Sequence, residues 1–119
     1  MRAAGAGLVF SSDLAGSDHD LFYGLHSAVA RRSPDGEPER GWYPEQAVSV
    51  EEALRGYTTW AARASFLEEH TGTLVPGAFA DLTVLDVDPF QLGAGQARDL
   101  LEGRVRMTIV GGRIVFGGR

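Results

Sequence analysis

The chain has 119 residues, of which 44% are hydrophobic and 23% are charged, which suits one globular domain or a piece of a larger one. With a net charge of −5 and no long run among its eleven basic residues, it has no electrostatic reason to bind phosphate backbones. We therefore expect no nucleic-acid partner. The absence of cysteine excludes disulfides and thiolate metal sites and fits a cytoplasmic location. No apolar stretch reaches the roughly 20 residues that span a bilayer, so we expect no membrane partner.

The first predicted element is a buried strand over Leu8 to Ser12. Its apolar residues follow Gly7, and its polar residues stand at its C-terminal end, where Asp13 comes next. The acidic segment from Leu14 to Asp20 is predicted to be a loop.

A helix is predicted after Asp20, whose carboxylate suits an N-cap. Its apolar residues recur at helical spacing, at Phe22, Leu25 and Val29. We expect Arg31 and Arg32 in its last turn, where cations interact favourably with the helix dipole. The turn-forming residues 33–36 are expected to end it.

A second helix is predicted to begin after Ser49, because Ser49 and Glu52 have the spacing of a capping box. Gly56 and the Thr58-Thr59 pair weaken this helix, so we expect it to bend or split there. The residues His70-Thr71-Gly72 are expected to end it.

Beyond Gly72 the apolar pattern becomes strand-like. A strand is predicted over Ala80 to Val87, and a short helix over Gln96 to Glu102. The runs 105–110 and 113–116 flank Gly111-Gly112, which indicates a β-hairpin because its turn needs positive φ at both central positions. We place a boundary near Gly72, which divides the chain into residues 1–72 and 73–119.

Several stretches together resemble the C-terminal portion of enzymes of the amidohydrolase superfamily. The resemblance is closer to the third amidohydrolase family, which includes N-substituted formamide deformylases. It covers nearly the whole chain. The matching stretches are Ser12-Asp13, the helix after Asp20, Gly41-Trp42-Tyr43-Pro44-Glu45-Gln46, Ser49 to Thr58, Gly72-Thr73-Leu74-Val75-Pro76-Gly77, Ala80-Asp81-Leu82 and Thr108 to Val115.

The resemblance implies an α/β fold class. Residues 1–72 would form the last strand and helices of a (β/α)8 barrel, and residues 73–119 would form the C-terminal strands and hairpin of a composite β-sandwich. The first barrel strands and the other half of the sandwich have no counterpart in this sequence.

The function implied is metal-dependent hydrolysis of carbon–nitrogen bonds other than peptide bonds, in amide or formamide substrates. Asp13 matches the family's carboxylate that contacts the divalent metal, expected to be zinc, and moves a proton to the leaving nitrogen. His19 would contact the small-molecule substrate from the last loop, although an exposed loop imidazole is the simpler interpretation. The family's His-x-His pair and further metal ligands are missing, so we expect the chain to be inactive alone.

Two alternatives compete with this interpretation. In the first, the chain is a non-catalytic structural or association module left from a truncated amidohydrolase. In the second, Asp86 and Asp88 after an apolar strand are the nucleophile pair of an aspartate-dependent phosphotransferase. Pro89 follows that pair and the chain has no lysine, so a strand-end turn fixed by Pro89 is the simpler interpretation. Asp81 is expected to bond backbone at the start of a strand.

The predicted strand over Leu8 to Ser12 lacks the two neighbours that a barrel strand normally has. Its backbone donors and acceptors would therefore face water or another chain. We expect the chain to self-associate, to bind a complementary barrel chain, or to be marginally stable alone. The strand over Ala80 to Val87 and the hairpin are expected to form a small sheet.

Overall fold

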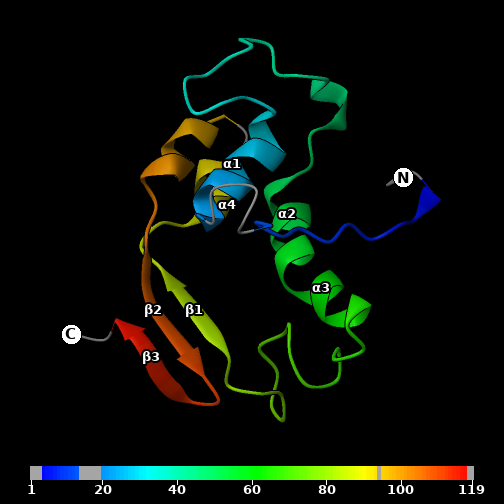
Figure 1. Ribbon diagram of the computed structural model, residues 1–119, viewed down its shortest axis with the longest axis vertical. Helices are drawn as coiled ribbons and strands as arrows, with labels where there is room; N and C mark the ends of the chain where they lie inside the picture. The colour runs from blue at the N-terminus through cyan, green and yellow to red at the C-terminus, as the bar shows by residue number, and fades with distance from the viewer. Residues whose placement is uncertain (1–3, 14–19, 94, 118–119) are drawn as a thin grey trace.

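The computed structural model describes residues 4–13, 20–93 and 95–117. Within them the chain is a small α/β structure with one three-stranded antiparallel sheet, and Figure 1 shows most helices gathered at the end away from the hairpin turn. None of the described helices is long and apolar enough to cross a bilayer. The elements in chain order are α1 (Leu21–Ala30), η2 (Pro44–Gln46), α2 (Val50–Tyr57), α3 (Thr59–Ala64), β1 (Leu82–Leu85), α4 (Pro89–Leu92), η3 (Ala97–Glu102), β2 (Val105–Val110) and β3 (Arg113–Gly117).

The helix α1 begins where it was predicted, because the Asp20 carboxylate accepts a hydrogen bond from the Phe22 backbone N–H at 2.8 Å. The expectation for its end is wrong: α1 stops at Ala30, and Arg31 follows it in the left-handed conformation with φ 55°. Arg31 is held there by the loop, since its Nε donates to the Trp42 carbonyl and its own carbonyl accepts from the Trp42 N–H. These contacts outweigh the weak attraction between the helix dipole and two arginines.

The capping box before α2 is confirmed, with Ser49 and Glu52 bonding each other's backbone N–H groups. The predicted split is also confirmed, because Thr58 separates α2 from α3 with ψ −94°. The predicted end at residues 70–72 is wrong, because α3 ends at Ala64. Phe66 takes up a left-handed conformation with φ 58° there, and the N–H groups of Phe66 and Leu67 donate to carbonyls in the last turn of α3.

The sheet has the strand order β1-β2-β3, and both neighbouring pairs are antiparallel. The predicted hairpin is confirmed, with φ 56° and 76° at Gly111 and Gly112. Asp81 has its expected structural role, since its carboxylate accepts a hydrogen bond from the Gly111 N–H at 2.7 Å. That bond ties the start of β1 to the hairpin turn.

Between β1 and β2 the chain forms two short helices. The short helix predicted over Gln96 to Glu102 is present as η3. The turn predicted at Pro89 is instead the start of α4, because Asp88 accepts a hydrogen bond from the Phe90 N–H and Pro89 suits the first helical position.

The segment Leu8 to Ser12 is extended but is not a strand, which corrects the prediction. It joins no sheet because no described strand lies beside it. It lies against α2 instead, where the Phe10 N–H donates to the Gly56 carbonyl at 3.2 Å. A Cβ on Gly56 would overlap the Phe10 ring, so the missing side chain is what allows this approach.

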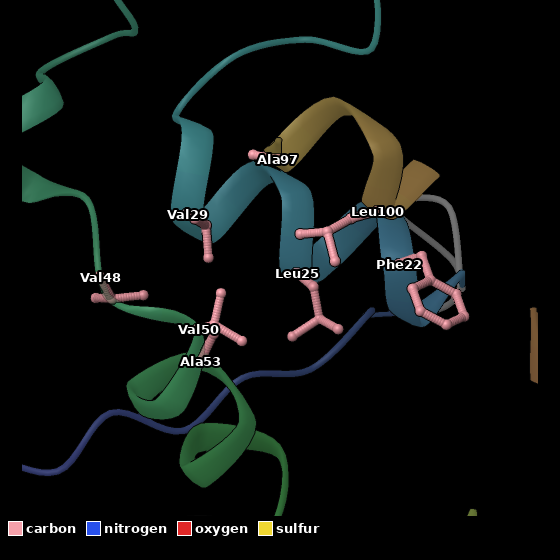
Figure 2. Close-up of a cluster of buried hydrophobic side chains, with 8 residues drawn as sticks. All are labelled: Phe22, Leu25, Val29, Val48, Val50, Ala53, Ala97 and Leu100. Atoms are coloured by element: carbon pink, nitrogen blue, oxygen red, sulfur yellow. The ribbon is translucent and has the colours of Figure 1, made fainter. Parts of the chain in front are cut away.

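The core forms where α1 packs against α2 and η3 (Figure 2). Phe22 and Leu25 on α1 and Leu100 on η3 are its largest fully buried side chains. The core therefore contains residues from both sides of Gly72, and the division at that position stays a prediction. The buried cluster comprises Phe22, Leu25, Val29, Val48, Val50, Ala53, Ala97 and Leu100.

Gly103 determines how closely η3 approaches α1, because a Cβ at this position would overlap the Phe22 ring. Its φ of −64° is open to any residue, so only the lack of space opposes alanine. We predict that Gly103→Ala lowers the free energy of unfolding by about 1–3 kcal/mol, measured by urea denaturation. Gly95→Ala is the matched control, because a Cβ at Gly95 meets no heavy atom within 4 Å and should change stability little. Equal stability of the two variants would contradict this packing.

Candidate functional site

Asp13 stands at the end of the extended segment that follows residue 7, and it is exposed. Its φ of 47° is left-handed, a conformation that aspartate tolerates better than most residues. Its backbone N–H donates to the Ser11 hydroxyl at 3.2 Å, which helps to fix this turn. The exposed carboxylate thus stands at the end of the segment, where the backbone is left-handed. His19 lies outside the described residues, as do all residues from 14 to 19.

The described residues do not make a metal site by themselves. Among residues 4–13, 20–93 and 95–117, no three His, Asp or Glu side chains gather closely enough to hold an ion. A catalytic zinc needs three protein ligands, and Asp13 is a single carboxylate. The donors described here therefore do not fit a bound divalent metal without contributions from elsewhere.

The two described histidines, His26 and His70, do not belong to a metal-binding cluster of described residues. His26 on α1 is 2% exposed, and its Nδ1 has no hydrogen-bond partner within the described part of the chain. Burial, and secondarily the nearby Arg32 charge, lower the pKa of His26 below its ordinary value of 6.5. His70 was expected near a helix end. It lies beyond the end of α3 instead, exposed and stacked on Phe79 with ring centroids 5.4 Å apart.

The carboxylates of Asp86 and Asp88 are both engaged in holding the backbone. Asp86 accepts a hydrogen bond from the Arg104 N–H at 2.6 Å and forms an ion pair with Arg106 at 3.2 Å. Asp88 caps α4. Because each carboxylate has a local structural partner, nothing in this arrangement favours the phosphotransferase alternative.

A groove of about 740 Å³ lies between β1 and the pair α2–α3, and the sequence analysis did not predict it. Leu54, Tyr57 and Ala61 form part of its helical wall. Burial raises the pKa of Tyr57 above its ordinary value. A Cβ on Gly24 would overlap the Tyr57 hydroxyl, so Gly24 lets α1 approach this wall closely. We call this feature the β1 groove.

Comparison with known proteins identifies the family. The model described as "Amidohydrolase family" matches residues 1–116, and the chain belongs to this family. The chain is similar to the protein LONG AFTER FAR-RED 3 of Arabidopsis thaliana, with 30% identity over 109 residues, which are 92% of this chain and 18% of that relative.

Two bacterial proteins are also similar. YtcJ of Bacillus subtilis, named as an amidohydrolase, is 33% identical over 97 residues, covering 82% of this chain and 18% of YtcJ. The N-substituted formamide deformylase of Arthrobacter pascens is 40% identical over 76 residues, covering 64% of this chain and 14% of the deformylase. The chain thus spans less than a fifth of the length of these relatives. No solved structure matches it significantly.

Buried His26 should make folding sensitive to mild acid. Because its folded-state pKa is lowered, the unfolded chain takes up a proton first as the pH falls below 6.5, and stability is lost in that range. We predict that the free energy of unfolding falls between about pH 7.5 and about pH 5.5, and that His26→Leu reduces this fall. His70→Gln, at an exposed site, should leave it unchanged. Parallel pH dependences of the His26→Leu variant and the parent would refute the assignment.

Proposed function

We propose that this chain is the C-terminal portion of a metal-dependent amidohydrolase that hydrolyses carbon–nitrogen bonds other than peptide bonds, in amide or formamide substrates. The observation that carries the proposal is the family match, which runs through Asp13 and over almost the whole chain. It is supported by two relatives whose names state an amidohydrolase and an N-substituted formamide deformylase.

In this proposal, residues 1–72 supply the last strand and helices of a (β/α)8 barrel, and residues 73–119 supply part of a β-sandwich. The segment Leu8 to Ser12 supports it, because this segment is extended and yet joins no sheet in the described structure. Two neighbouring barrel strands would pair with the backbone of this segment.

Asp13 is proposed as the carboxylate that takes a proton from the attacking water and passes it to the leaving nitrogen. Its placement at the C-terminal end of the extended segment is where barrel enzymes carry their chemistry. The divalent metal that Asp13 would contact, proposed to be zinc, requires donors from amidohydrolase segments that this chain does not span, because the described residues do not hold one. The chain alone would therefore be inactive.

A non-catalytic association module is the second candidate. It is favoured by the same lack of a metal-donor set within the described ranges. In that case Asp13 would only shape the bend after the extended segment, through its left-handed backbone. The two candidates differ in what the Asp13 carboxylate contributes once a complete barrel is present.

A hybrid enzyme separates these candidates. We would replace the region of the Arthrobacter pascens deformylase that is equivalent to residues 1–116 of this chain, including the position of Asp13, with this chain and measure hydrolysis of an N-substituted formamide. Asp13→Asn, which keeps the shape and removes the charge, should lower kcat by about 100-fold or more because a positioned proton-transfer group is lost. Asp35→Asn, at an exposed turn, is the matched control and should keep full activity. An Asp13→Asn hybrid as active as the control would leave the association module as the better account.

A further inference from the structure

The extended segment before Asp13 is anchored to α2 through Phe10. The Phe10 N–H donates to the Gly56 carbonyl at 3.2 Å, and the Phe10 and Tyr57 ring centroids lie 5.7 Å apart. Figure 1 shows the segment running past α2. Asp13 lies beyond this anchor, so the direction of its side chain depends on how the backbone turns after Phe10.

The Ser11 hydroxyl takes part in that turn. Its oxygen accepts a hydrogen bond from the Asp13 backbone N–H at 3.2 Å. A serine hydroxyl that bonds the N–H two residues further along stabilises a tight local turn. The bond therefore acts directly on the residue whose carboxylate is proposed to move the proton.

The backbone of Asp13 needs such support. Its φ of 47° is left-handed, and aspartate tolerates this conformation without preferring it to the extended and right-handed regions. Residues held in sparsely populated conformations are common at functional sites, where surrounding contacts maintain them. A change of φ to a negative value would turn the Asp13 side chain in a different direction.

A contribution to overall stability is a weaker explanation of the same bond. Ser11 and Asp13 are both exposed, so the bond between them buries no polar group and closes no part of the core. An exposed hydrogen bond adds little to the free energy of folding, because water replaces either partner when the bond opens. Its main physical effect is on orientation.

We propose that Ser11 is a positioning residue, whose hydroxyl holds Asp13 in the left-handed turn and so aims the carboxylate at the attacking water and the leaving nitrogen. The inference rests on the proposed function for the role of that carboxylate. A displacement of about 1 Å in a catalytic group costs up to about 100-fold in rate. The loss of one orienting bond should therefore be visible in kcat.

Ser33 provides a matched control. Its hydroxyl accepts a hydrogen bond from the Glu37 N–H at 3.3 Å, in the loop that follows α1. Ser33→Ala thus removes a hydroxyl-to-backbone bond of the same kind at a position remote in the chain from Asp13. Ser11→Thr is the conservative variant, because it keeps the hydroxyl and an exposed position has room for the added methyl group.

The first test is hydrogen exchange of single amides in the isolated chain. We expect Ser11→Ala to lower the protection factor of the Asp13 amide by about threefold or more, the value of one exposed hydrogen bond. Ser33→Ala should leave the Asp13 amide unchanged and should lower protection at Glu37 instead. Unchanged protection of Asp13 in Ser11→Ala would overturn the inference.

The second test uses the hybrid enzyme made with the Arthrobacter pascens deformylase. We expect Ser11→Ala to lower kcat by about tenfold and to leave KM within about twofold, because the carboxylate is misdirected while substrate binding is retained. Ser11→Thr and Ser33→Ala should keep the kcat of the parent hybrid. In an Asp13→Asn hybrid, Ser11→Ala should have no further effect, because no carboxylate is left to direct.

The kinetic outcomes separate a positioning role from a structural one. A loss of kcat that is equal with and without the Asp13 carboxylate would show that Ser11 supports the fold of the hybrid, and would reject the inference. Equal kcat of the Ser11→Ala and Ser33→Ala hybrids would reject it as well. An impaired Asp13→Asn hybrid beside an unimpaired Ser11→Ala hybrid would keep the proposed function and remove only the role of Ser11.

Discussion

The contact between the Phe22 ring and the bare backbone of Gly103 joins α1 to the C-terminal end of η3. It brings η3 onto α1, and the buried Leu100 completes the same core. Because β1 lies before η3 and β2 lies directly after it, the sheet is anchored to the helices through this contact. The position of β1 beside α2 and α3, and with it the groove between them, depends on the same packing.

Around that core, the described structure leaves a strand edge unpaired and several apolar side chains exposed. The segment Leu8 to Ser12 is extended without a sheet, and the outer edge of β1 is unpaired among the described strands. Apolar side chains such as Leu74 and Val115 are largely exposed. A complete small domain would bury such surfaces within itself. This chain spans less than a fifth of the length of its relatives, and in the proposed function the rest of the barrel would cover these surfaces.

The features that the sequence predicted correctly depend on local chemistry. The capping box at Ser49 and the glycine turn at Gly111 need only residues a few positions away. The predictions that were wrong concern elements that depend on distant partners or on unexpected residues. Leu8 to Ser12 is not a strand because no described strand lies beside it, and α3 stops at a left-handed phenylalanine, Phe66, where glycine is the usual signal.

The same distinction between local and long-range interactions applies to the candidate site. The sequence predicted the position of Asp13 at the end of an apolar segment, and the structure shows that the residue is exposed at a bend. The β1 groove could not be predicted, because it arises from elements packing across long stretches of chain.

We propose that the segment before Asp13 pairs, in a complete amidohydrolase barrel, with strands other than those described here. Hydrogen exchange of individual backbone amides in the isolated chain tests it most directly. The account predicts rapid exchange at Leu8, Val9 and Ser11, and slower exchange at Phe10, which donates to Gly56. Protection of Leu8 and Val9 as strong as that of the α1 amides would show that the segment already has its partners, and would contradict the account.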